Sequence, residues 1–180
     1  MYKMATFILL LFYHYFLAQF VQYFIHYSLH TFHTFHSDLF KGHFSHHDKP
    51  YKITWYGDPN PGKTQGIIYD YAIILYVIHI FILYSNKLLH ICAFSVILSS
   101  FLVFHGMCHN LSEKTQKKIP FINILFFHHY KHHIENKKIN FGFADLFFDF
   151  LFGTLDLSPV YLNTKRKQKL HDKYFSLKNV

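Results

Sequence analysis

The apolar and polar positions divide this chain into three long apolar stretches and two polar ones. The apolar stretches are Ala5–Phe24, Ile67–Tyr84 and Leu88–Phe104, and none contains proline, glycine, lysine, arginine or glutamate. A helix needs about 17–25 mostly apolar residues to cross the hydrocarbon core of a bilayer. Only three residues separate the last two stretches, which predicts a tight helical hairpin. We therefore expect an all-α integral membrane helical bundle with about three spans.

The two polar stretches, residues 26–66 and 105–180, should lie on the same side of the membrane, because two spans separate them. Sixteen of the 18 Lys and Arg residues fall in these stretches, and only Lys3 and Lys87 fall on the opposite side. Lys and Arg are enriched in cytoplasmic loops. The bias therefore places both polar stretches in the cytoplasm, and we expect a membrane of the endoplasmic reticulum type.

Two prolines mark boundaries in the second polar stretch. Pro120 opens a short apolar piece, Phe121–Phe127, which is too short to span and is expected at the membrane interface. Pro159 ends the folded part. We thus expect a membrane domain over residues 1–160 and a basic cytoplasmic tail over residues 161–180.

Composition supports a membrane protein and narrows its partners. The 180 residues are 51% hydrophobic and 21% aromatic, with a formal net charge of +8. The first apolar stretch resembles a signal peptide in position, but no small-x-small cleavage site follows it, so we interpret it as a retained anchor. The basic tail suits a solvated position near anionic headgroups, and no nucleic-acid partner is expected. The two cysteines have no partner pattern.

Histidines form the most informative polar pattern. Thirteen of the 17 histidines fall into four clusters, all on the expected cytoplasmic face. Residues three and four apart share one face of a helix, so an H-x-x-H-H box brings three imidazoles together and an H-x-x-x-H pair brings two. The clusters are His26/His30/His33/His36, His43/His46/His47, His105/His109 and His128/His129/His132/His133.

This ligand set predicts a cytoplasmic polyhistidine di-metal cap. Imidazole suits Fe, Zn, Cu and Ni, whereas a structural zinc is satisfied by four ligands. About eight to ten clustered histidines therefore imply two metals with open coordination positions. Four isolated histidines have no companion at ligand spacing, and we expect them to pack or to form hydrogen bonds: His14, His79, His90 and His171.

The residues after the last box resemble a known family. Seven residues after His132-His133 comes Phe141-Gly142, followed by Asp149 and then by Phe152-Gly153-Thr154. Together with Tyr27-Ser28-Leu29-His30 and the H-x-x-H-H-x-x-P segment of His43–Pro50, this ending is similar to the fatty acid hydroxylase superfamily, which includes sterol desaturases and fatty acid 2-hydroxylases. Phe148 stands where the family usually has Trp. The resemblance covers residues 23–157.

The resemblance implies metal ligands residue by residue. Eight positions match family ligands: His43, His46, His47, His105, His109, His129, His132 and His133. The first motif leaves alternatives, and we assign His30 and His36, with His26 and His33 as the other candidates. Glu135 and Asp149 are candidates for carboxylates that orient imidazole N–H groups, although Asp149 could equally cap a turn beside Gly153.

The resemblance also implies an activity. Two metal ions, iron with zinc as the alternative, would use dioxygen to hydroxylate a lipid, in the first place a fatty acyl chain such as that of a sphingolipid. No His-Pro-Gly-Gly signature of a cytochrome b5 domain occurs, so we expect a separate electron donor such as cytochrome b5 or a reductase. The alternatives are a sterol or acyl desaturase with the same site and, more remotely, a metal transporter or an inactive metal-binding relative.

Overall fold

Helices make up all the regular structure of the described residues. The computed structural model describes residues 2–31, 43, 47, 65–120, 122–135, 138–142 and 144–176, and no strand occurs within these ranges. The predicted all-α class is therefore confirmed for them. Three helices are long: α1 (Tyr2–Thr31), α3 (Gln65–Leu83) and α4 (Lys87–Asn110). The short helices are α5 (Glu113–Gln116), α6 (Asn123–Ile134), α7 (Phe147–Leu151) and α8 (Lys165–Ser176).

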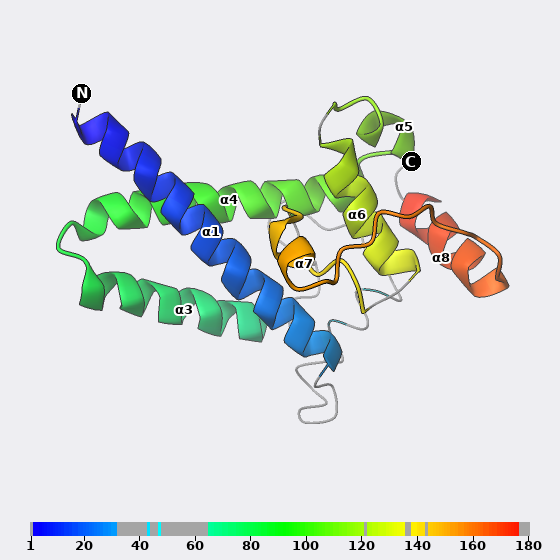
Figure 1. Cartoon of the computed structure of the whole chain (residues 1–180), viewed down its shortest axis with the longest axis horizontal. Coiled ribbons are helices and arrows are strands. Elements are labelled where there is room, and N and C mark those ends of the chain that lie inside the picture. The colour runs from blue at the N-terminus through cyan, green and yellow to red at the C-terminus, as the bar shows by residue number, and fades with distance from the viewer. Residues whose placement is uncertain are drawn as a thin grey trace.

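The long helices form the frame on which the rest is built. Helices α3 and α4 run side by side in opposite directions, as the short separation between their sequences predicts (Figure 1). Helix α1 crosses this hairpin and packs mainly against α4. The short helices gather at one end of the frame, whereas the chain's N-terminus and the α3–α4 turn lie at the other end (Figure 1).

Two of the helices are long and apolar enough to cross a membrane, Met4–Thr31 and Lys87–Asn110. Within α3, the part Ala72–Leu83 is a shorter apolar helix. The apolar side chains of these helices point largely outward, and Leu9 and Leu88 are 69% and 73% exposed. Exposed apolar surface of this extent marks a membrane or protein interaction site.

Hydrogen bonds between polar side chains connect the three long helices to one another. The Nδ1 atom of His14 lies 2.6 Å from the Tyr76 hydroxyl, and its Nε2 atom lies 3.1 Å from Nδ1 of His90. His79 lies 3.3 Å from the Tyr84 hydroxyl. These isolated histidines therefore form hydrogen bonds, as predicted. Such bonds between helices help to hold membrane bundles together.

The end of the chain departs from the solvated tail that its charge suggests. Residues Lys165–Ser176 form α8, and Tyr174 on this helix is only 2% exposed. Tyr174 packs against Tyr130 and Ile134 of α6. Leu170 lies one helical turn before Tyr174, so the helix has an apolar face that the high count of basic residues conceals. Most of the described basic side chains of α8 are exposed on its other faces.

Candidate metal centre

Five buried histidines from separate segments form the first imidazole cluster. Helix α1 supplies His26 and His30 near its end, α6 supplies His132, and His43 and His47 come from the segment between α1 and α3. One ring nitrogen of each histidine lies within 4.8 Å of those of all the others. A group of this kind could bind a metal ion.

The nitrogen atoms of the first cluster make more contacts with one another than hydrogen bonds alone can satisfy. The Nε2 atoms form a series in which His30 and His43 lie 2.8 Å apart, His43 and His47 3.0 Å, and His47 and His132 3.2 Å. Each Nε2 of a neutral imidazole has either one hydrogen or one lone pair. The two middle atoms each face two neighbours, so a shared cation is a better partner for the group than pairwise hydrogen bonds.

Backbone carbonyls select the tautomer of two of these histidines. The Nδ1 atom of His26 donates to the carbonyl of Phe141 at 2.6 Å, and Nδ1 of His132 donates to the carbonyl of Ile139 at 2.5 Å. Since a carbonyl only accepts, both Nδ1 atoms carry hydrogen, and in the neutral ring the Nε2 lone pair is left for a metal. Burial, together with nearby His26 and His30, lowers the pKa of His132 well below 6.5, so its ring is neutral at pH 7.

The second imidazole cluster joins the ends of α4 and α6. His105 and His109 are one turn apart on α4, and with His129 of α6 they form a second group whose ring nitrogens lie within 4.8 Å of one another. The Nε2 atoms of His109 and His129 are 3.0 Å apart. His133, one turn after His129, extends this cluster, since its Nε2 lies 3.1 Å from that of His129.

The two clusters are neighbours. His132 and His133 are consecutive residues of α6, yet the first faces His47 and the second faces His129. The rings of His47 and His133 also approach each other, with 4.3 Å between their centroids. A helix turns by about 100° per residue, which allows consecutive histidines to serve two adjacent sites.

Asp149 organises the loop that holds the first cluster. Its carboxylate accepts hydrogen bonds from the backbone N–H groups of Phe141 and Gly142, both at 2.7 Å, and from the Thr154 hydroxyl, also at 2.7 Å. The fourth partner is Nε2 of His128, at 3.0 Å. Burial alone would raise the pKa of Asp149, but the bonds from His128, Thr154 and Gly142 outweigh burial and lower it. Asp149 therefore orients the imidazole of His128, which belongs to neither cluster, and also caps the loop.

Glycines in this loop allow the Asp145 carbonyl and the Asp149 carboxylate to approach the backbone closely. A Cβ atom at Gly142 would lie 2.6 Å from the Asp145 carbonyl oxygen and 2.9 Å from a carboxylate oxygen of Asp149. Gly153 has a φ of +69°, in the left-handed region that favours glycine. The Phe-Gly, Asp and Gly-Thr positions that carried the family resemblance are therefore one packed unit beside His26.

Glu135 has a different role from the one expected. It lies 3.1 Å from Nζ of Lys167 and 3.9 Å from Nζ of Lys131, and no described contact joins it to an imidazole of either cluster. Lys131, in the middle of the last box, is fully buried and pairs with Asp156 at 2.7 Å. The hydrogen bonds from Lys131 and Ser158 lower the pKa of Asp156 to about 2.

The described ligand candidates all lie in one of the two clusters. Of the other candidates, His33, His36 and His46 lie outside the described residues. His26, which ranked behind His36 in the sequence, lies within the first cluster beside His30. His128, Lys131 and Tyr174 were not singled out. The sequence marks His128 only as a member of the last box, and Lys131 and Tyr174 only as one basic residue and one aromatic residue among many.

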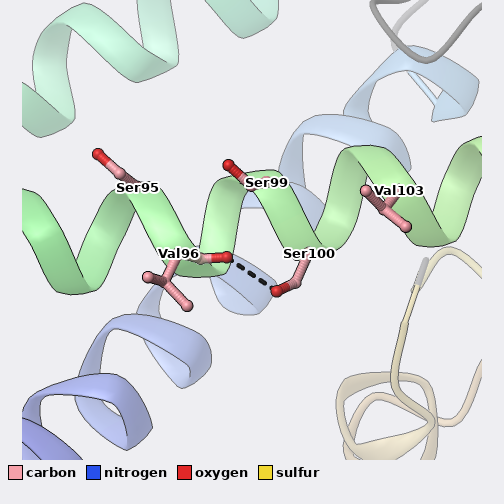
Figure 2. A pocket seen from close by; sticks show the side chains of 5 residues that line it. All are labelled: Ser95, Val96, Ser99, Ser100 and Val103. Atoms are coloured by element: carbon pink, nitrogen blue, oxygen red, sulfur yellow. Dashed lines mark hydrogen bonds between the residues drawn. The ribbon is translucent and has the colours of Figure 1, made fainter.

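A shallow, open patch of short side chains lies along α4. Figure 2 shows the short side chains that line it, and all of them belong to α4. The lining residues are Ser95, Val96, Ser99, Ser100 and Val103.

No family model, curated protein or solved structure matches this chain.

Proposed function

We propose that this protein is a membrane-bound di-iron oxygenase that hydroxylates a lipid, most simply a fatty acyl chain. The observation that carries the proposal is the pair of adjacent, largely buried imidazole clusters to which His132 and His133 each contribute one ring. Neutral imidazoles suit iron and zinc alike. When bound, two iron ions would supply the activation of dioxygen needed to attack an unactivated C–H bond.

The residues of this chain would hold the ions and keep water away. The first cluster offers five nitrogens and the second offers three, with a fourth in His133. His26 and His132 are fixed by carbonyls, so their Nε2 lone pairs are already directed inward. Pre-organised ligands of this kind need little rearrangement when a metal binds. Asp149 fixes the loop that presents the Phe141 carbonyl to His26.

The position of the two clusters supports a lipid substrate and an electron donor that approach from one face of the membrane. The clusters lie at the ends of α1 and α4, where an acyl chain in the bilayer could present a carbon to them. Basic residues are concentrated on the same side, which favours a cytoplasmic position in an endoplasmic reticulum-type membrane and access for a separate electron donor.

A desaturase with the same site is the second candidate, because hydroxylation and desaturation both begin by removing hydrogen from carbon. A transporter is a poorer match, because its paired ligands should lie near the middle of its spans. Here the clustered histidines lie at helix ends, and the histidines within the long helices are bound to tyrosines or to one another.

The test is to express the chain in membranes, measure bound iron and zinc, and follow lipids under oxygen with a reducing system. A product heavier by one oxygen atom that is lost in His129→Ala, but kept in the control His79→Ala, would support hydroxylation. A product lighter by two hydrogen atoms would favour the desaturase. Protein that inserts into membranes but binds no metal would refute both.

A further inference from the structure

Helix α8 places an aromatic side chain against the second imidazole cluster. The ring of Tyr174 lies 5.5 Å from that of His109 and 5.6 Å from that of His133, measured between centroids. Tyr174 is 2% exposed. Tyr174 therefore contacts one histidine of α4 and one of α6. No sequence motif links it to either of them.

The hydroxyl of Tyr174 fixes the end of α4. It donates to the carbonyl of Cys108 at 3.0 Å, and Gln116 donates to the same carbonyl at 3.0 Å. The last four carbonyls of a helix have no partner within the helix and need one from elsewhere. Cys108 directly precedes His109, so this bond holds the turn of α4 that carries a ligand candidate.

Helix α8 is itself attached firmly to α6. The Tyr130 hydroxyl lies 2.7 Å from Nδ1 of His171, and Lys167 donates to Glu135 at 3.1 Å. One turn after His171, the ring of Tyr174 packs on that of Tyr130, with 5.3 Å between centroids. The position of Tyr174 is therefore set by α6, the helix that also carries His129 and His133.

We infer that Tyr174 is a positioning residue for a metal bound by the second cluster. Its ring confines the imidazoles of His109 and His133 and excludes water on the side covered by α8, while its hydroxyl holds the end of α4. It is not a ligand in this arrangement, because the hydroxyl is directed to a carbonyl. The inference rests on the proposed function only in assuming that a metal binds there.

The experiment compares the full-length protein with Tyr174→Ala and Tyr174→Phe in membranes or lipid discs. Metal content is measured directly, and the protein is also loaded with Co²⁺, whose visible absorption reports the geometry of each site. Tyr161→Ala removes an exposed tyrosine (63% exposed) as the matched control. Leu170→Ala weakens the packing of α8 and alters a residue that packs beside Tyr174.

We expect Tyr174→Ala to lose about one of the two metal equivalents, or to bind one about 10–100-fold more weakly, as for other residues that orient ligands. Tyr174→Phe keeps the ring, so it should retain both metals but show a changed Co²⁺ spectrum. Tyr161→Ala should match the unchanged protein, and Leu170→Ala should lose less metal than Tyr174→Ala, because it keeps the tyrosine.

Three results would overturn the inference. The first is two tightly bound metals and an unchanged spectrum in Tyr174→Ala, and the second is an equal loss in Leu170→Ala. If Tyr174→Ala does not fold, an unchanged Co²⁺ spectrum in Tyr174→Phe would be the third. A protein that binds no metal before any substitution would instead refute the proposed function.

Discussion

At the scale of single residues, the site depends on groups that place the histidines as much as on the histidines themselves. Asp149 holds the backbone of Phe141 and Gly142, and the carbonyl of Phe141 receives the Nδ1 hydrogen of His26. The Asp149 carboxylate thus orients the His26 ring indirectly, through the backbone of Phe141. Its effect should be visible in metal affinity as well as in the stability of the loop.

Asp149→Asn should weaken metal binding by the first cluster about 10–100-fold, a usual cost of losing a group that orients ligands. The amide cannot accept all four hydrogen bonds, because one of its two terminal atoms is a donor. Titration of the metal-free protein with Zn²⁺ or Fe²⁺ would measure the change. The control is Asp145→Asn, because Asp145 accepts from the backbone of Phe147 in the same loop. Equal affinities for both variants would contradict the role given to Asp149.

Gly142→Ala should destabilise the protein by about 1–3 kcal/mol, as is usual when a group is forced into a packed site. Its Cβ would meet the Asp145 carbonyl oxygen at 2.6 Å. Gly106→Ala is the matched control, because a Cβ at Gly106 has no heavy atom within 4 Å and alanine favours a helix. Thermal unfolding in detergent would compare the two. A Gly142 variant as stable as the Gly106 variant would show that the loop adjusts freely.

At the scale of elements, α6 is the helix on which most contacts depend. It carries one ligand candidate of the first cluster and two of the second, and it receives α8 on another side. The spacing of the box predicted that these histidines would share a helix. The buried Lys131 between them was not predicted, because a lysine beside histidines is ordinarily solvated. Its pairing with Asp156 becomes visible only once the chain after α7 returns to α6.

The pair of Lys131 and Asp156 should make the attachment of this segment sensitive to acid. The pKa of Asp156 is about 2 in the folded protein, below its ordinary value of 3.8. A lowered pKa contributes stability above the unfolded value, and that contribution is lost as pH falls through the folded value. The melting temperature of the metal-free protein should therefore exceed that of Asp156→Asn at pH 5, and the difference should shrink between about pH 4 and pH 2. Because Asp156 is partly exposed, we expect a small difference. A difference that does not change with pH would contradict the assignment.

At the scale of the whole molecule, the short helices lie at one end of the long ones (Figure 1), and the ends of α1 and α4 together with α6 carry most histidines of both clusters. The α3–α4 turn lies at the other end, with the N-terminus. If the three long helices cross the membrane, the turn and the tail must face opposite sides. This expectation can be tested independently of any activity.

Single cysteines at Ser85 in the turn and at Tyr161 before α8 should react on opposite faces of sealed vesicles. Both positions are exposed, and Cys92 and Cys108 would be replaced by alanine in both proteins. We expect a membrane-impermeant maleimide to label Tyr161→Cys from the cytoplasmic side and Ser85→Cys from the other side. Labelling of both from one side would exclude the arrangement with three spans.

The sequence by itself determined the helical class, the hairpin of α3 and α4, and the histidines available as ligands, because these follow from local periodicity and length. Which histidines converge was decided by the tertiary structure, since the grouping of His26 and His30 with His132 depends on how α1 crosses toward α6. The same holds for Tyr174: its neighbours come from two other helices, and no spacing along the chain encodes them.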